Sequence, residues 1–234
     1  HGGHLPHGWK VNFSGKFYNP VQFSVTNDTE LLDYAEIRRL ARENKPKMIM
    51  AGITAYPRIV DWDIFREIAD EVGAYFVADV AHVSGLIAAG RYPNPVPLAD
   101  VVTSTTHKTF RGPRGGMIMC KEELAAKIDR AVFPGLQGGP HNNTTAGIAV
   151  AAQEATTQDF KDYAQRILDN AKALGEGLAS RGYRLVTGGT DTHMLVVDVT
   201  PKGISGRQAS QALDRAGIVC NFNSIPYDPR KPFD

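Results

Sequence analysis

The feature that most constrains the fold is a regular alternation of short apolar runs with amphipathic segments in the first half of the chain. The strand-length apolar runs lie at residues 47–51, 74–78, 100–103 and 116–120. Strand, helix, strand units in sequence pair in parallel through right-handed crossovers, and continuous apolar strands indicate that both faces of the sheet are covered. The sequence therefore predicts an α/β layer.

Two helices are marked by their ends. Asp33 followed by Glu36 is typical of a helix start, and that helix should run to about Asn44. A second helix can be capped by Asp61 and ended by Gly73, and its apolar side chains recur on one face. A short strand is also expected at residues 21–25.

The second half of the chain has a different pattern. It turns helical at Asn142, and apolar residues recur at helical spacing from Phe160 to Leu178. Beyond them we expect a strand at residues 194–199 and a helix at residues 206–216. We predict a large α/β domain at residues 1–157, then a bridging helix and the start of a smaller α+β domain at residues 158–234.

Composition excludes several classes of protein. Hydrophobic residues make up 42% of the chain and charged residues 22%, which is usual for a globular protein. The formal net charge of +1 is too small for the basic field that nucleic-acid binding requires, and no apolar run approaches the roughly 20 residues that span a bilayer. Cys120 and Cys220 have no disulfide or zinc spacing, so a reducing, cytoplasmic compartment is expected. The residues at both ends of the chain are typical of loops and turns, so we expect a fragment of a longer protein.

Polar side chains follow the apolar runs, where parallel sheets place their ligand crevices. Thr54, Tyr56 and Arg58 follow the first run, Asp79 ends the second, and Lys108 follows the third. Asp79 and Lys108 are 29 residues apart, the length of one crossover and a strand, so they can face one ligand from neighbouring strand ends.

A lysine near a sheet core is usually held there for its neutral amine, which Schiff-base chemistry needs. An aspartate at a strand end can hold the protonated pyridine nitrogen of pyridoxal phosphate. The competing interpretation is that Asp79 caps a turn and Lys108 is solvated. A metal site is disfavoured because His4, His7, His82 and His107 lack metal-ligand spacing. Glycine pairs at residues 2–3 and 138–139 could bind a phosphate or simply form turns, and Arg111 and Arg114 could be fixed cations or solvated side chains.

Several motifs together resemble one enzyme family. They are GGHLPHG at 2–8, NFSGK at 12–16, DVAH at 79–82, TTHKT at 105–109, GPRGG at 112–116, PGLQGGP at 134–140, GGTDTH at 188–193 and NSIPYD at 223–228. In these segments, which extend over essentially the whole chain, the sequence resembles serine hydroxymethyltransferase. The resemblance implies a fold-type I pyridoxal 5'-phosphate enzyme that moves a one-carbon unit between serine and tetrahydrofolate, leaving glycine.

The resemblance also implies roles for individual residues. Lys108 would form the Schiff base, Asp79 would hold the pyridinium nitrogen, and His4 would stack on the cofactor, while His107 would tune or position Lys108. Thr54 and His82 would contact the cofactor's phenolic oxygen. Gly139 would reach the phosphate of a neighbouring subunit's cofactor, which implies a homodimer or dimer of dimers with shared sites. The folate pocket would be lined by Gly3, Leu5, Asn223, Lys231, Pro232 and Phe233.

Departures from the family pattern leave alternatives open. Thr54 stands where serine is common, and Ser104 and Arg111 also differ from the commonest residues. The family's general acid/base glutamate, phosphate-binding Ser-Gly segment and cofactor tyrosine would precede His1, and its carboxylate-binding arginine would follow Asp234. We therefore expect the chain alone to be inactive. A threonine-aldolase-like or aminotransferase-like enzyme would share Asp79 and Lys108, whereas a non-catalytic dinucleotide-binding domain lacks its GxGxxG motif here.

Overall fold

The computed structural model describes residues 7–52, 54–228 and 230. The chain forms two compact units. One contains the described residues of the segments His1–Leu40, Thr54–Ile59 and Ile167–Asp234, here called the terminal unit. The other contains those of Ala41–Ile53 and Val60–Arg166, here called the sheet unit. Each unit is described by itself.

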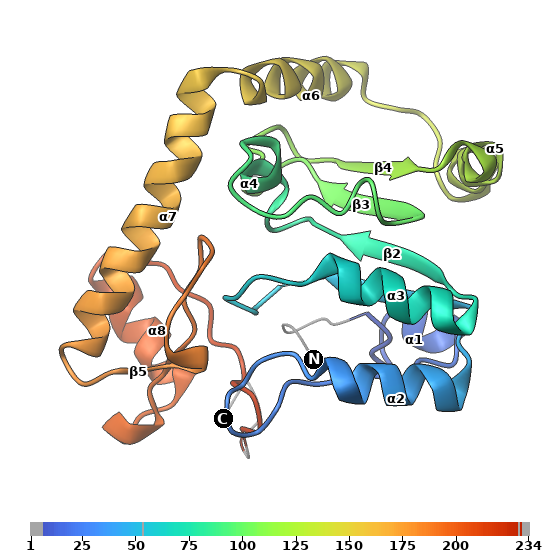
Figure 1. The fold of residues 1–234 in the computed structure, drawn as a ribbon. Coiled ribbons are helices and arrows are strands. Elements are labelled where there is room, and N and C mark those ends of the chain that lie inside the picture. Colours follow the sequence, from blue (N-terminus) through green and yellow to red (C-terminus); the bar gives the residue numbers. More distant parts are fainter. Residues whose placement is uncertain (1–6, 53, 229, 231–234) are drawn as a thin grey trace. The chain divides into compact units, whose positions relative to one another are not determined.

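The sheet unit contains the α/β layer that the sequence predicts. Its strands are β1 (Met48–Gly52), β2 (Tyr75–Asp79), β3 (Val101–Thr105) and β4 (Gly116–Cys120), in that spatial order. β1, β2 and β3 are parallel, which confirms the predicted pairing, whereas β4 is antiparallel to β3. The sheet is therefore mixed, because the loop that joins β3 to β4 returns the chain without a helical crossover (Figure 1).

Local signals define the helix that covers this sheet. Helix α3 (Trp62–Val72) begins where the Asp61 carboxylate accepts a hydrogen bond from the amide of Ile64, 3.1 Å away. It ends at Gly73, whose φ of 69° is left-handed and suits glycine. The helix packs on β1 and β2. Its fully buried Phe65 stacks on Phe76 of β2 with ring centroids 5.9 Å apart, so the predicted helix face lies in the core.

The residues on the two faces of the sheet are less completely buried than the apolar runs suggest. Three consecutive residues of β2 are buried, as expected for a strand with both faces covered. In β1 and β3 buried positions alternate with more exposed ones, and β4 has no buried position. The expectation of two covered faces is therefore met at β2 alone among the described strands. β1 and β4 lie at the edges of the sheet, whereas β3 is an inner strand with one face less buried than the other.

The remaining helices of the sheet unit follow the strands in order. They are α4 (Ser84–Ala88), α5 (Glu122–Arg130), the π-helix η1 (Ala131–Leu136) and α6 (Asn142–Ala155). Helix α2 (Tyr34–Asn44) starts in the terminal unit and ends in the sheet unit, and α7 (Gln158–Ala179) runs the other way. Helix α7 begins beside the predicted domain boundary near residue 157, and that boundary stays a prediction.

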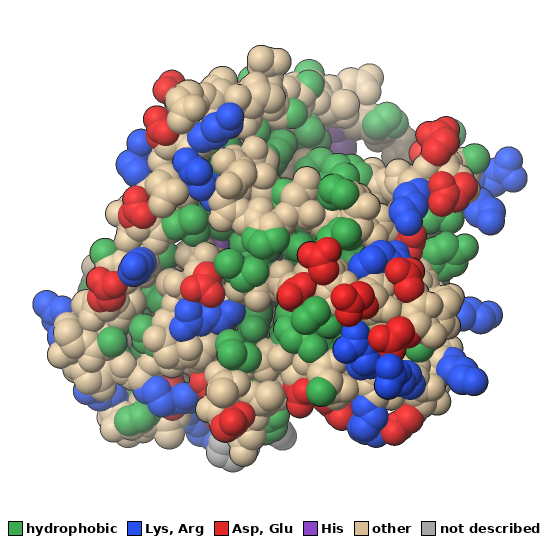
Figure 2. Space-filling model, in the orientation of Figure 1, with side chains coloured by type: hydrophobic (Ala, Val, Ile, Leu, Met, Phe, Trp, Pro, Cys, Tyr) green, Lys and Arg blue, Asp and Glu red, His purple; other side chains and the backbone are tan. Residues whose placement is uncertain are grey.

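Figure 2 shows positive and negative side chains interspersed over α3, where Arg66 pairs with Asp70 at 2.7 Å.

Besides its parts of α2 and α7, the terminal unit is built from short elements. They are α1 (Phe13–Phe17), β5 (Arg184–Leu185), η2 (Val186–Gly188), β6 (Val197–Asp198), η3 (Thr200–Lys202) and α8 (Gly206–Arg215). Strands β5 and β6 form a two-stranded antiparallel sheet, and Ser205 and Gln208 form a capping box at α8. The predicted helix at 206–216 is confirmed.

Two predicted strands are much shorter than expected. The segment 21–25 forms only an isolated bridge between Val25 and Leu32, and the run at 194–199 forms the two-residue β6. An apolar run becomes a strand only where a partner offers its backbone groups. Val21 is 45% exposed, so its side chain is not held against a core.

Among the described residues, no helix combines the length and the apolar character that a bilayer crossing requires.

Candidate active site

Asp79 lies at the carboxyl end of β2, at the centre of the sheet edge where a ligand is expected. In the strand register it is the neighbour of Gly52 in β1 and of Thr103 in β3. The carboxylate is partly buried, and its Oδ1 atom accepts a hydrogen bond from the amide of Ala81 at 3.1 Å. Gly52 leaves room for Asp79, because a Cβ atom at position 52 would lie 2.8 Å from the Asp79 Cβ.

The loop after β3 carries Lys108 and is closed by its own hydrogen bonds. Thr106 has no exposed surface, and its hydroxyl donates to the carbonyl of Pro113 at 2.6 Å. The Thr106 carbonyl accepts from the amide of Gly112 at 2.6 Å, and the Thr106 amide donates to Gly115 at 3.0 Å. The base of the Lys108 loop is therefore fixed by contacts made before and after the lysine.

Two threonines join the Lys108 loop to the loop that follows Asp79. The Thr109 hydroxyl donates to the carbonyl of His82 at 2.7 Å and accepts from the amide of Gly85 at 3.1 Å. The Thr105 hydroxyl donates to the carbonyl of Ala81 at 3.3 Å. The structure therefore brings the chain segments of Asp79, His82 and Lys108 together. The sequence alone assigns these hydroxyls no role, since their partners lie at least 24 residues away.

The contact at Gly85 is unusually close. A Cβ atom at this position would lie 2.1 Å from the carbonyl oxygen of Thr109 and 2.7 Å from the amide nitrogen of Phe110. These are backbone atoms, which cannot turn away as a flexible side chain can. Glycine at position 85 therefore allows α4 to pack directly against the Lys108 loop.

Lys108 itself is exposed, which differs from the expectation of a lysine held near the sheet core. The reason is its place in a turn beyond the end of β3, where the Lys108 carbonyl accepts from the amide of Arg111 at 2.9 Å. The amine is thus presented at the carboxyl end of the sheet instead of within it.

His107 makes its contacts away from Lys108. Its Nε2 atom lies 3.0 Å from Nη1 of Arg114, and its Nδ1 atom lies 3.4 Å from the amide of Gly115. A guanidinium can only donate, so Nε2 is the acceptor in the shorter contact. The ring is therefore directed to the start of β4, and any effect of His107 on Lys108 stays a prediction.

Arg111 closes the Lys108 turn in a left-handed backbone conformation, with φ of 53°. Its guanidinium lies over two aromatic rings of α7, 5.1 Å from the centroid of Phe160 and 4.7 Å from that of Tyr163. It also pairs with Glu154 at 3.4 Å. Simple solvation does not describe this side chain, because the cation stacks on aromatic faces while one end remains in water.

Asp100 joins β2 and β3 at their opposite, amino-terminal ends. Its carboxylate accepts from the Phe76 amide at 2.7 Å, from Arg66 at 2.9 Å and from Lys121 at 2.7 Å. Burial by itself raises the pKa of Asp100, but the hydrogen bonds from Lys121, Phe76 and Arg66 outweigh it and lower the pKa to about 2. Asp100 is thus ionised throughout the physiological range.

The other predicted site residues are spread over both units. Thr54 is exposed and Asn223 is half-buried, and both lie in the terminal unit. Tyr56, also noted at this strand end, is buried, and burial raises the pKa of its phenol. Gly139 lies in an exposed stretch of the sheet unit with φ of 55°. Gly3, His4, Leu5, Lys231, Pro232 and Phe233 lie outside the described residues.

The donor set at the sheet edge fits a pyridine-type cofactor. Asp79 supplies an acceptor for a protonated ring nitrogen, and the exposed Lys108 supplies a primary amine for a carbonyl group. Gly52 in the neighbouring strand leaves the room that Asp79 occupies, since a Cβ atom there would clash with it. In the described part of the chain, no group of three or more His, Cys, Asp or Glu residues is arranged to hold a metal ion.

Comparisons with known proteins agree on one family. A family model described as serine hydroxymethyltransferase matches residues 1–234. A serine hydroxymethyltransferase of Sorangium cellulosum (strain So ce56) is 62% identical over 233 residues, which cover 100% of this chain and 55% of that relative. Those of Desulfotalea psychrophila (strain LSv54 / DSM 12343) and Legionella pneumophila (strain Lens) are each 58% identical over all of this chain and over 55% and 56% of their own lengths. The chain thus spans about half the length of the curated relatives it matches.

Proposed function

The chain belongs to the serine hydroxymethyltransferase family, and from this premise we propose that it forms the cofactor-holding part of an enzyme with pyridoxal phosphate. The proposed reaction is the reversible transfer of a hydroxymethyl group between serine and tetrahydrofolate, giving glycine and methylene-tetrahydrofolate. The family has the fold-type I architecture of pyridoxal-phosphate transferases, and the mixed α/β layer agrees with it. The observation that carries the proposal is the carboxylate of Asp79 beside the amine-bearing loop of Lys108, at the ends of neighbouring parallel strands.

Asp79 and Lys108 of the sheet unit each have a chemical role in this proposal. When bound, pyridoxal phosphate supplies an electron sink for bond cleavage at the substrate's α-carbon. Asp79 would accept a hydrogen bond from the ring nitrogen and keep the proton there, since a carboxylate stabilises a neighbouring cation. Lys108 would hold the cofactor through its Nζ atom and release it to the substrate amine.

The ties between the two loops support this assignment. Catalysis that depends on positioning needs the two groups held at a constant separation, and positioning can lower a barrier by roughly 7–11 kcal/mol. Thr109 and Thr105 hold the backbone of the Lys108 loop to that of residues 81–85. The backbone of this part of the site is therefore preorganised.

Further residues are assigned by the family resemblance alone. We propose His82 and Thr54 as contacts to the cofactor's phenolic oxygen, His4 as the stacking ring, and His107 as a residue that tunes Lys108. Gly3, Leu5, Asn223 and Lys231–Phe233 are the proposed folate contacts.

We also propose a cytoplasmic homodimer, or a dimer of dimers, in which Gly139 approaches the cofactor of the neighbouring subunit. The segment before Gly139 supports an interface, because Phe133 is 65% exposed and Leu136 is 74% exposed. Large apolar side chains exposed together are typical of surfaces that another chain covers. Sedimentation equilibrium would measure the oligomeric state.

The central assignment can be tested by trapping the cofactor. We define the completed protein as this chain extended by the segments that flank the matched region in the Sorangium cellulosum relative. After loading with pyridoxal phosphate and borohydride reduction, mass spectrometry should place the pyridoxyl group on Lys108. Lys108→Ala should lose the adduct, whereas the matched change Lys16→Ala should keep it. A pyridoxyl adduct on another lysine of the unsubstituted completed protein would refute the assignment.

The reaction itself needs a separate assay. The completed protein should release glycine from serine, with the one-carbon unit appearing on tetrahydrofolate. Folate-independent cleavage of threonine as the main activity would favour the aldolase alternative, and amino-group exchange with a keto acid would favour an aminotransferase. Asp79→Asn should abolish most turnover, because the uncharged amide cannot stabilise the ring proton.

A further inference from the structure

Arg111 attaches the turn that carries Lys108 to helix α7 within the sheet unit. The amide of Arg111 donates to the carbonyl of Lys108 at 2.9 Å, which closes the turn at residues 108–111. The guanidinium of the same residue lies 5.1 Å from the ring centroid of Phe160 and 4.7 Å from that of Tyr163. Both rings belong to the first turns of α7 and to the same compact unit as Lys108. One residue therefore closes the turn through its backbone and attaches it to α7 through its side chain.

The two rings are themselves held in place. Phe160 is only 1% exposed, and its ring centroid lies 5.9 Å from that of Tyr163. At the bend between α6 and α7, the Thr157 hydroxyl donates to the carbonyl of Glu154 at 2.7 Å and accepts from the amide of Phe160 at 3.3 Å. The rings are thus a buried, hydrogen-bonded support on which a cation can be fixed.

The backbone conformation of Arg111 also indicates that its side chain matters. Its φ of 53° is left-handed, which is uncommon for residues other than glycine. Such conformations persist where the surroundings over-determine them, and they concentrate at functional sites. Glycine would adopt this φ without strain, so the contacts of the arginine side chain must offset the cost of the backbone conformation.

The exposure of Lys108 makes the position of this turn important. Lysine carries its amine on a flexible four-carbon stem, and the Lys108 side chain is exposed, so the backbone of the turn determines the region that the amine can reach. The hydrogen bonds of Thr106 and Thr109 hold the base of the loop, whereas the Arg111 contacts act on the turn itself. Capture of a carbonyl group by an amine depends on such positioning.

We propose that Arg111 is a positioning residue for Lys108. By stacking on Phe160 and Tyr163 it keeps the turn at 108–111 closed, and it thereby restricts the region from which the Lys108 amine reaches the carbonyl group of pyridoxal phosphate. This inference rests on the proposed function, since it takes Lys108 as the residue that holds the cofactor. It gives Phe160 and Tyr163 an indirect role in cofactor capture, through Arg111.

Hydrogen exchange in the completed protein without cofactor tests the attachment itself. In Arg111→Ala and Arg111→Gly, the protection factor of the amide at position 111 should fall by about tenfold, because the cation–π contacts that keep the turn closed are lost. The Thr106 amide, which donates to the carbonyl of Gly115 at 3.0 Å, is the internal reference and should keep its protection. A general loss of stability would instead lower the protection of both amides.

The rate of cofactor capture tests the consequence for Lys108. Pyridoxal phosphate is added, the adduct is reduced with borohydride at timed intervals, and mass spectrometry quantifies the pyridoxyl group on Lys108. Capture should be about tenfold slower in Arg111→Ala and Arg111→Gly. Arg111→Lys should restore part of the rate, because lysine keeps the charge but lacks the planar face that lies over two rings.

A double-mutant cycle connects the effect to the rings. Tyr163→Leu keeps an apolar side chain but removes one aromatic face, so capture should be about threefold slower. The double variant with Arg111→Ala should be no slower than Arg111→Ala alone, since the ring acts through the guanidinium. Effects that multiply in the double variant would overturn this route.

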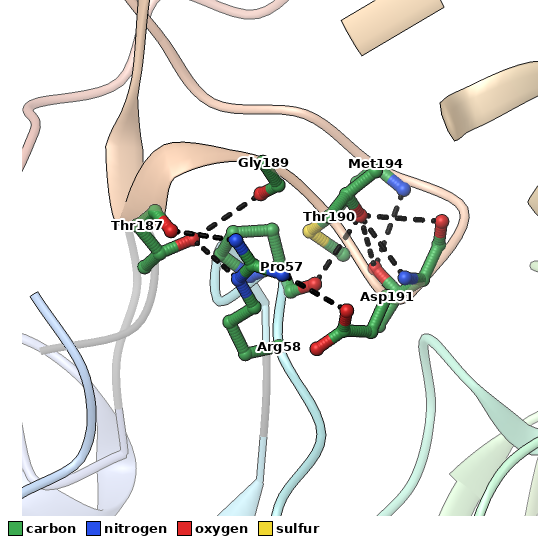
Figure 3. Close-up of polar contacts among 8 residues, drawn as sticks. Pro57, Arg58, Thr187, Gly189, Thr190, Asp191 and Met194 are labelled. Carbon is green, nitrogen blue, oxygen red and sulfur yellow. Dashed lines mark hydrogen bonds and ion pairs between the residues drawn. The ribbon is translucent and has the colours of Figure 1, made fainter. Parts of the chain in front are cut away.

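Two control variants separate the rings from other contacts. Glu154→Gln should leave both readouts unchanged, because its pair with Arg111 is exposed and 3.4 Å long. Asp191→Asn weakens a comparable arginine attachment in the terminal unit, where Arg58 donates to Asp191 at 2.9 Å and to the carbonyl of Thr187 at 2.6 Å (Figure 3). It should lower the free energy of unfolding while the protection at position 111 and the capture rate stay unchanged.

The outcomes are distinguishable. Unchanged protection at position 111, or an unchanged capture rate, in Arg111→Ala and Arg111→Gly would overturn the inference. A loss in Glu154→Gln as large as in Arg111→Ala would also overturn it, because the ion pair would then be the attachment. If Arg111→Ala fails to fold, Tyr163→Leu decides, and an unchanged capture rate there refutes the role of the rings. Absence of a Lys108 adduct in the unsubstituted protein would instead contradict the proposed function, whereas the exchange measurement needs no cofactor.

Discussion

The replacement of Asp100 by asparagine probes the anchor that holds the amino-terminal ends of β2 and β3. Asp100 is only 9% exposed, and its carboxylate accepts from the Phe76 amide, Arg66 and Lys121. Asparagine keeps the size but loses the charge and one acceptor oxygen. Because Arg66 still pairs with Asp70 and Lys121 is 44% exposed, the cations left behind remain partly solvated.

The pKa of Asp100 sets the magnitude. A pKa lowered from 3.8 to about 2 corresponds to about 2 kcal/mol of stability at neutral pH, since one pKa unit is about 1.4 kcal/mol. For a chain of this length that loss lowers Tm by about 4–8 °C. The folded pKa lies below the unfolded one, so the contribution is complete above about pH 4 and is lost as pH falls toward 2.

Urea unfolding of the parent and of Asp100→Asn at pH 7, 5, 3.5 and 2.5 measures this directly. The two free energies of unfolding should differ by about 2 kcal/mol at pH 7 and 5 and should converge as the pH falls below about 4. Asp70→Asn is the matched control, because Asp70 pairs with the same Arg66 but its side chain is 69% exposed, so it should cost less than about 1 kcal/mol. An equal gap at pH 7 and pH 2.5, or equal losses in both variants, would show that the ionised Asp100 is not the anchor.

Two further predictions concern the Lys108 loop. Gly85→Ala should lower the free energy of unfolding by about 1–3 kcal/mol in urea, because the new Cβ would meet the Thr109 backbone, whereas Gly138→Ala, with no atom within 4 Å, should be nearly neutral. Arg111→Ala should cost about 1 kcal/mol through loss of the Phe160 and Tyr163 contacts, and Arg111→Gly should cost less, since glycine adopts the left-handed φ of 53° without strain. A glycine variant less stable than the alanine variant would contradict this account of the turn.

The parts of the fold that sequence predicts well are those encoded locally. Helix α3 is bounded by its caps, Asp61 and Gly73, because a side-chain cap and a left-handed glycine each act within one turn of the helix end. The strands β1 to β4 lie within one or two residues of their apolar runs. Asp79 and Lys108 reach neighbouring strand ends because a crossover of that length leaves few alternatives in a parallel sheet.

The parts that sequence does not predict depend on partners far along the chain. Thr109 binds His82 and Gly85, and no local pattern distinguishes it from the other hydroxyls in its segment. The terminal unit is an extreme case, because Glu30 binds Arg184 at 3.0 Å across more than 150 residues. The segments at 21–25 and 194–199 have apolar patterns but form only a bridge and a two-residue strand, because a strand also needs a partner strand that no local pattern specifies.

The two ends of the β2–β3 pair are held by different chemistry, and this separates stability from function. At the amino-terminal ends the charged Asp100 carboxylate binds Arg66 and the Phe76 amide. Asp79 and Lys108 lie at the other ends of these strands. At the carboxyl ends Thr105, Thr109 and the missing Cβ of Gly85 hold the loops themselves. Weakening the charged anchor should therefore lower Tm while the folded protein keeps its cofactor affinity. Gly85→Ala should change both Tm and cofactor affinity, because the same contact that stabilises α4 also determines the position of the Lys108 loop.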